Sequence, residues 1–187
     1  MKIAITGLVS SGKSTVAKFL SQGKYPIYSA DKEVAKLYEK NLFKKLIASS
    51  FKLKNNQNLK KNLKKLILKN EKNLNKLEKI IHPKVRKKMK KFFLQNKFKK
   101  FLICEIPLLV ESKINTFFDL VIFVGSSKIT RLKRYQRNGG SKQIFNILDK
   151  RQMTPNKKIK YCDHVVVNNS SLIILKKKIF NILSKYE

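Results

Sequence analysis

The sequence predicts a three-layer α/β fold, in which helices cover both faces of a five-stranded parallel sheet. Short apolar segments alternate along the chain with segments of helical periodicity, which is the pattern of such folds. Residues 7–14 read Gly-Leu-Val-Ser-Ser-Gly-Lys-Ser and match G-x-x-x-x-G-K-[ST], the phosphate-binding P-loop. The 187 residues suffice for one domain of this kind with insertions. We therefore expect the P-loop NTPase fold.

The motif has the flanking elements that phosphate binding requires. Residues 1–6, Met-Lys-Ile-Ala-Ile-Thr, predict a short buried strand, and residues 14–20 predict a helix with apolar residues on one side. The N–H groups and the dipole at the start of such a helix favour an anion. We expect Lys13 to reach the β and γ phosphates of ATP and the Ser14 hydroxyl to hold Mg²⁺. The expected phosphate-binding residues are Gly7, Leu8, Val9, Ser10, Ser11, Gly12, Lys13, Ser14 and Thr15.

Four further segments predict the remaining strands of the sheet. They span residues 25–30, 101–106, 119–124 and 163–167. The runs at 101–106 and 119–124 are nearly continuously apolar, as in parallel strands that are buried on both faces. A closing helix is expected over about residues 172–183, where apolar residues recur at helical spacing.

Two helical regions interrupt this core. Residues 32–100 have helical periodicity, divided by the Asn-rich loop at 54–58, and Pro83 is expected to begin a new helix in its first turn. Residues 128–153 are polar and helical, with a turn at Asn138-Gly139-Gly140. We expect a nucleotide-binding core formed by residues 1–31, 101–127 and 154–187. Residues 32–100 would form a helical insertion that binds the substrate, and residues 128–153 would form a helical lid.

The charge of the chain is extreme. Its 44 Lys and Arg against 11 Asp and Glu give a net charge of +33. This favours binding of nucleic acid through phosphate neutralisation, or else a general bias toward lysine at surface positions. Lysine is spread over most of the chain, and a cluster of aromatic residues for base stacking is not apparent. We therefore expect no specific nucleic-acid partner.

The sequence also predicts where the protein acts. Cys104 and Cys162 lie in apolar segments without the spacing of a metal site, which favours free thiols in a reducing compartment. No apolar run approaches the roughly 18 residues that span a bilayer, and the chain starts with a strand rather than a signal peptide. We expect a cytoplasmic monomer with no membrane partner.

Three arginines are candidates for the lid. Arg131, Arg134 and Arg137 are spaced at i, i+3 and i+6, which places them along one broad helical face. Guanidinium groups bind phosphate oxygens bidentately, so this face is suited to close over ATP and to stabilise the transferring phosphoryl group. The alternative is a solvated basic helix.

Several other side chains are candidates for chemistry. Asp31 follows a strand and is placed to act as general base, or alternatively to cap a helix that begins at Lys32. Glu105 is either a ligand of Mg²⁺ or a buried carboxylate paired with a cation. Glu111 is a candidate contact to substrate, and His82 contacts substrate or caps and packs at a helix start.

Together these segments resemble the dephospho-CoA kinase family over nearly the whole chain. The matching segments, in order, are the P-loop, Ser29-Ala30-Asp31, Leu77-Glu78-Lys79-Ile80-Ile81-His82-Pro83-Lys84-Val85-Arg86, Glu105-Ile106-Pro107-Leu108-Leu109-Val110-Glu111, the three lid arginines, Arg151-Gln152 and 162–169, Cys-Asp-His-Val-Val-Val-Asn-Asn. The family commonly has Asp where this chain has Ser29, and Asp where it has Glu105.

The resemblance implies a reaction and a set of roles. The reaction is ATP-dependent phosphorylation of the ribose 3′-hydroxyl of dephospho-CoA, with Asp31 acting on that hydroxyl. The implied contacts are His82 and Arg86 at the CoA end, Pro107, Leu108 and Glu111 at the acceptor, Arg137 and its neighbours in the lid, and Asn168 and Asn169 near the adenine. The alternatives are another small-molecule or nucleoside monophosphate kinase with a P-loop and, on the basis of charge, a nucleic-acid-stimulated ATPase.

Overall fold

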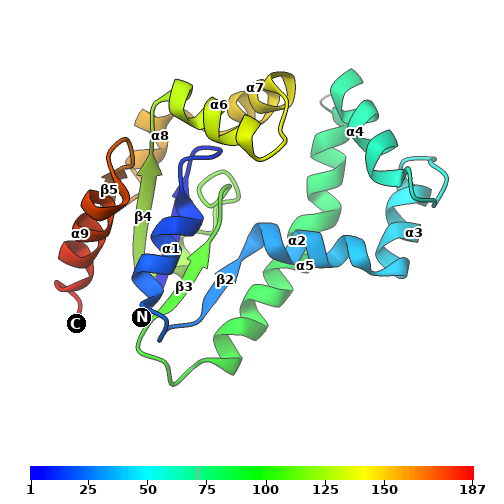
Figure 1. Ribbon diagram of the computed structural model, residues 1–187. Helices are drawn as coiled ribbons and strands as arrows, with labels where there is room; N and C mark the ends of the chain where they lie inside the picture. Colours follow the sequence, from blue (N-terminus) through cyan, green and yellow to red (C-terminus); the bar gives the residue numbers. More distant parts are fainter. Residues whose placement is uncertain (71) are drawn as a thin grey trace. The chain divides into compact units, whose positions relative to one another are not determined.

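A parallel sheet of five strands organises the molecule (Figure 1). The computed structural model describes residues 1–70 and 72–187. The strand order is β2-β3-β1-β4-β5, and all neighbouring pairs are parallel, as predicted. The strands are β1 (Lys2–Gly7), β2 (Ile27–Ser29), β3 (Leu102–Glu105), β4 (Leu120–Gly125) and β5 (His164–Val167).

The central strand β1 lies between β3 and β4. Ala4 is in register with Cys104 on one side and with Val121 on the other. All of β3 and β4 is buried, which explains why these segments are almost wholly apolar in the sequence. Because the strands are parallel, their carboxyl ends meet at one edge of the sheet, where α/β folds bind their ligands.

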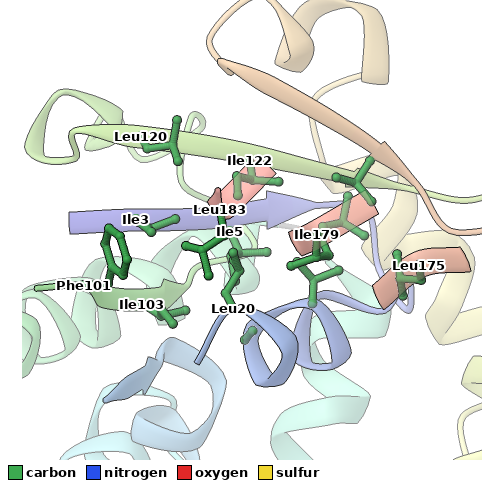
Figure 2. Packing of buried hydrophobic residues seen from close by; sticks show 14 residues of the cluster. Ile3, Ile5, Leu20, Phe101, Ile103, Leu120, Ile122, Leu175, Ile179 and Leu183 are labelled. Atoms are coloured by element: carbon green, nitrogen blue, oxygen red, sulfur yellow. The ribbon is translucent and has the colours of Figure 1, made fainter. Parts of the chain in front are cut away.

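Two helices pack on one face of this sheet and form the main core (Figure 2). Helix α1 (Lys13–Ser21) contributes Val16 and Leu20, and helix α9 (Leu172–Leu183) contributes a stripe at four-residue spacing. The bounds of α9 match the prediction, because the Ser171 hydroxyl caps its first turn by accepting from the Ile174 N–H. The strand side of this core includes Ile3, Ile5, Ile103, Leu120, Ile122 and Val124.

The segments after β3 and β4 are short helices. They are the 3₁₀ helix η1 (Asn115–Phe117) and the α-helices α6 (Lys128–Arg137), α7 (Lys142–Arg151) and α8 (Pro155–Ile159). The hydroxyls of Ser127 and Ser141 cap α6 and α7. The predicted pair of helices on either side of residues 138–140 is therefore confirmed.

The chain divides into two compact units. The first comprises residues 1–29 and 96–187 and contains the sheet, and the second comprises residues 30–95. The second unit consists of α2 (Ala30–Glu39), α3 (Asn41–Ser50), α4 (Leu59–Lys69) and α5 (Lys72–Gln95). It has an apolar core of its own, built from Leu37, Phe43, Ile47, Ala48, Phe51, Leu59, Leu63, Leu77 and Ile81.

The expectation that Pro83 begins a helix is wrong, because Pro83 lies inside α5. A proline there removes one backbone hydrogen bond and disfavours a helix interior. The apolar stripe of α5 nevertheless continues across it at four-residue spacing, with Leu77, Ile81 and Met89 buried and Val85 packed against the same core. Burial of this stripe outweighs the lost bond, so the helix runs through the proline.

Within residues 1–70 and 72–187, we find no helix with the length and apolar character needed to cross a membrane.

Candidate active site

The phosphate loop, residues 8–12, connects the carboxyl end of β1 to α1. Gly7, just before the loop, and Gly12, its last residue, are required by geometry. Gly12 has φ of 98°, and a Cβ there would approach Asn168 Nδ2 to 2.2 Å. A Cβ at Gly7, where φ is 147°, would lie 2.1 Å from the Val124 carbonyl oxygen. Glycine is therefore the residue that allows the loop to pass so close to β4 and to Asn168.

The predicted phosphate-binding lysine is folded back over this loop. Lys13 is the first residue of α1 and is buried, and its ammonium donates to the Leu8 carbonyl oxygen at 2.8 Å. A buried cation at the N-terminus of a helix gives this position a strong preference for an anion.

A hydroxyl and a carboxylate meet beside the lysine. The Ser14 hydroxyl donates to Glu105 Oε1 at 2.7 Å, and Glu105 is buried at the carboxyl end of β3. Oxygen ligands of this kind suit Mg²⁺, which takes one or two carboxylates and completes its shell with phosphates and water. The part of the chain that the structure describes has no cluster of three or more His, Cys, Asp or Glu that could hold a metal ion.

Two of the three lid arginines contact the loops around the phosphate loop. Arg131 is buried and pairs with Asp149 Oδ1 at 2.5 Å, while its Nε donates to the Ser126 carbonyl oxygen at 3.1 Å. Arg134 donates to the carbonyl oxygens of Asn168 at 3.1 Å and of Ser11 at 3.4 Å.

The third arginine has different surroundings. Arg137 is exposed at the end of α6. The three arginines lie on one helix, as predicted, and their side chains differ in burial.

The two asparagines after β5 hold neighbouring loops together. Asn168 is buried and donates from Nδ2 to the Ser11 carbonyl oxygen at 2.8 Å. Asn169 Oδ1 accepts from the Ser126 hydroxyl at 2.8 Å and from the Ser127 N–H at 2.9 Å. These contacts connect the end of β5 to the phosphate loop and to the start of α6.

Pro107, Leu108 and Glu111 lie in the turn that follows β3, here named the acceptor loop (residues 107–111). The Pro107 carbonyl oxygen accepts from the Thr6 hydroxyl at 3.1 Å and from Lys158 Nζ at 2.6 Å. Glu111 Oε1 accepts from the Met153 N–H at 2.9 Å and from Lys158 Nζ at 3.0 Å. Glu111 Oε2 is buried and has no hydrogen-bond partner among residues 1–70 and 72–187.

Two residues near the phosphate and acceptor loops had no predicted role. Gln152 accepts from the Val9 N–H at 2.7 Å and donates to the Gly7 carbonyl oxygen at 3.2 Å. Lys158 is completely buried, and burial lowers the pKa of its ammonium despite the nearby charge of Glu111. Lys158 carries no signal that separates it from the other cations of the chain. Gln152 lies in one of the segments that carry the family resemblance, but its position in the sequence relative to the other motifs does not indicate a structural or catalytic role.

Three predicted site residues belong to the second unit. Asp31 is exposed and lies in the first turn of α2, which begins at Ala30, so the alternative that it caps a helix starting at Lys32 is wrong. His82 lies inside α5 and is half-buried, which excludes a role at a helix start, and Arg86 follows it by one turn.

The two cysteines are free. Cys104 is buried in β3 as expected, whereas Cys162 is only partly buried.

The comparisons with known proteins agree with one another. Residues 1–173 match the family model described as dephospho-CoA kinase. A dephospho-CoA kinase from Fusobacterium nucleatum is 36% identical over 184 residues, which cover 96% of this chain and 95% of that protein. Among solved structures, TT1252 from Thermus thermophilus is 26% identical with a TM-score of 0.81, and it covers 100% of this chain and 98% of its own. A dephospho-CoA kinase from Campylobacter jejuni is 25% identical with a TM-score of 0.65, covering 100% of this chain and 97% of its own. The chain belongs to the dephospho-CoA kinase family.

Proposed function

We propose that the protein transfers the γ-phosphoryl group of ATP to the ribose 3′-hydroxyl of dephospho-CoA, which yields CoA and ADP. The observation that carries this proposal is the phosphate loop with a buried Lys13 at its end, in a chain that matches the dephospho-CoA kinase family over residues 1–173. The family implies ATP and dephospho-CoA as substrates, and the loop provides the phosphate site that a kinase requires.

The phosphate loop and the lid would divide the binding of ATP between them. Lys13 has to exchange its bond with the Leu8 carbonyl oxygen for the β and γ phosphates. Arg137 has an exposed side chain at the end of α6, so it is suited to reach a ligand as the lid closes. Arg131 and Arg134 already bond to loops around the phosphates and would support that surface. Asn168 and Asn169 are proposed to lie near the adenine.

Ser14 and Glu105 are the residues that would hold Mg²⁺. The bound ion would neutralise charge on the β and γ phosphate oxygens. Ser14 Oγ and Glu105 Oε1 are already within 2.7 Å of each other, so the two oxygen ligands are brought together before any nucleotide binds. Glu105 would also orient the Ser14 hydroxyl through this hydrogen bond.

Asp31 is proposed as the general base. A hydroxyl acceptor must lose its proton as the phosphoryl group arrives, and a positioned carboxylate takes that proton and orients the attacking oxygen. Asp31 follows Ser29 by two residues, and Ser29 is in register with Glu105. The chain thus places Asp31 directly after a strand whose carboxyl end faces the ligand edge of the sheet.

The acceptor would be held by the acceptor loop and by the second unit. Glu111, in the acceptor loop, is proposed to contact dephospho-CoA. His82 and Arg86, one turn apart on α5, are proposed to contact the CoA end of the substrate.

The test is ADP formation by the purified protein with MgATP, with and without dephospho-CoA, near physiological salt. We expect a strong rise with dephospho-CoA, and 3′-phosphorylation of the product can be checked by mass spectrometry and NMR. A panel of nucleoside monophosphates and other small hydroxyl acceptors separates this reaction from that of another P-loop kinase. Turnover that responds to DNA or RNA instead, and falls steeply with salt, would overturn the proposal.

A further inference from the structure

We propose that residues 152–158 act as a positioning strap, which holds the phosphate loop and the acceptor loop in register through Gln152 at one end and Lys158 at the other. The inference rests on the proposed function, since it takes the acceptor loop to bind the phosphoryl acceptor. It adds two positioning residues to the reaction, neither of which touches the reacting atoms.

The first end of the strap is the side-chain amide of Gln152. It accepts from the N–H of Val9 in the phosphate loop at 2.7 Å and donates to the carbonyl oxygen of Gly7, the last residue of β1 before the loop, at 3.2 Å. Both functions of the amide are used, so its orientation is determined. Because these bonds join residues 143 and 145 positions apart, they fix the strap on the loop rather than stabilising a local turn.

The second end is the ammonium of Lys158 in α8. This side chain is completely buried, and its Nζ donates to Glu111 Oε1 at 3.0 Å and to the Pro107 carbonyl oxygen at 2.6 Å. The two acceptors are the last and first residues of the acceptor loop. One buried cation therefore closes the loop across its ends.

A third contact lies between these ends. The backbone N–H of Met153, the residue after Gln152, donates to Glu111 Oε1 at 2.9 Å. Glu111 thus accepts from both parts of the strap, and any shift of residues 152–158 moves the acceptor loop with it. Just before the strap, Asp149 of α7 pairs with Arg131 of α6, and this ion pair joins the two helices of the proposed lid.

The burial of Lys158 indicates a positional role rather than a contribution to stability. Burying an ammonium group costs free energy, whereas burying an apolar side chain of similar length is favourable, and the desolvation cost of a buried ion pair can exceed its Coulombic gain. Most lysines of this chain are exposed, in contrast to Lys158. A buried Lys that bridges two ends of a substrate loop is consistent with orientation of that loop, where misplacement by about 1 Å can cost about 100-fold in rate.

The kinetic experiment compares Gln152→Met and Lys158→Met with Lys157→Met. Lys157 is an exposed neighbour in α8, so it controls for loss of a positive charge. We expect Lys158→Met to raise KM for dephospho-CoA about tenfold and to leave KM for ATP within about twofold of the wild type. Gln152→Met should raise KM for ATP about tenfold and leave KM for dephospho-CoA within about twofold. Lys157→Met should match the wild type in both constants.

Hydrogen–deuterium exchange without substrates tests the strap independently of the reaction. The acceptor loop is followed by a turn in which the amides of Ser112, Lys113 and Ile114 donate to Leu108, Val110 and Leu109. These amides should exchange faster in Lys158→Met, and the amides of the phosphate loop should exchange faster in Gln152→Met. Lys157→Met should leave both segments unchanged.

A milder variant covers the case in which Lys158→Met does not fold. Glu111→Gln keeps the shape and an oxygen acceptor but removes the charge that strengthens the Lys158 contact. Because Glu111 is itself proposed to contact the acceptor, the readout for this variant is exchange rather than KM: residues 112–114 should exchange faster than in the wild type, and unchanged exchange would overturn the strap.

The outcomes separate the strap from the proposed function. Equal changes in both KM values, or unchanged exchange in both segments, would overturn the strap even if dephospho-CoA is the substrate. A wild-type protein without activity on dephospho-CoA would overturn the function, while the exchange data would still decide whether the strap holds the two loops.

Discussion

The hydroxyl of Ser14 donates a 2.7 Å hydrogen bond to Glu105, which lies 91 positions later in the chain. Ser14 is in the first turn of α1 and Glu105 is the last residue of β3. The two meet because β1 and β3 are adjacent and parallel, so the phosphate loop leaves β1 beside the carboxyl end of β3. This pair gives the site a carboxylate next to a conformationally fixed hydroxyl.

Ser14→Ala should lower kcat and raise the Mg²⁺ concentration needed for half-maximal rate. The variant removes one oxygen ligand and leaves Glu105 without its donor. Ser14→Thr keeps the hydroxyl and is the matched control, because the motif accepts either residue. Titrating MgCl₂ at fixed ATP measures the effect, and equal Mg²⁺ dependence of Ser14→Ala and wild type would rule out this ligand.

Lys13→Met should reduce kcat/KM by about 10²–10³-fold, since it removes a buried charge aimed at the transferring phosphoryl group. Lys18→Met, in the same helix but exposed, is the control for charge and helix propensity. Steady-state kinetics of both variants, with melting temperatures to confirm folding, provide the comparison. Similar losses of kcat/KM in both variants would contradict the role of Lys13 at the transferring phosphoryl group.

Gly12→Ala should destabilise the fold and impair ATP binding. Its φ of 98° disfavours any residue with a Cβ, and that Cβ would collide with Asn168 Nδ2 at 2.2 Å. We expect a loss of about 1–3 kcal/mol in the free energy of unfolding. Gly23→Ala also has positive φ but meets nothing within 4 Å, so it measures strain without the collision. Chemical denaturation of the two variants separates these contributions, and equal losses would show that contact with Asn168 is unimportant.

Burial raises the pKa of the Cys162 thiol to about 11, although the charge of Lys158 acts in the opposite direction. Because the thiolate is the reactive form, only about one molecule in a thousand is reactive at pH 8. Alkylation by iodoacetamide should therefore be slow at pH 8 and accelerate tenfold per pH unit up to about pH 11. Cys104, whose pKa burial raises further, should stay unmodified while the sheet is folded. Mass spectrometry of each peptide gives both rates, and rapid labelling of Cys162 at pH 8 would contradict the prediction.

Regular elements and the phosphate loop followed from local patterns, which explains why they could be predicted. The apolar run at 101–106 contains β3, and Ser127 and Ser141 cap the helices expected on either side of residues 138–140. In each case the signal lies within a few neighbouring residues.

Contacts between distant segments could not be predicted in the same way. Gln152 and Lys158 contact loops far away in the sequence, and nothing in the local sequence distinguishes Lys158 from the other Lys and Arg residues of the chain. The expectation that Pro83 begins a helix was wrong for a related reason. Its local preference was outweighed by packing of α5 against the core of the second unit.

Asp31→Asn should lower kcat by about 10²–10⁴-fold, which is the usual contribution of a general base. The amide keeps the size of the side chain but cannot take a proton from the acceptor hydroxyl. Binding of ATP should be nearly unchanged, because the phosphates are proposed to bind to the loop with Lys13 and Ser14, whereas Asp31 is proposed to act on the acceptor hydroxyl. Isothermal titration with a non-hydrolysable ATP analogue measures binding, and single-turnover kinetics measure the chemical step. Glu33→Gln is the control, since Glu33 lies in the same first turn and pairs with Lys36 at 2.7 Å. If Asp31→Asn keeps most of its kcat, another group must accept the proton, and the assignment of the base to the start of α2 would be wrong.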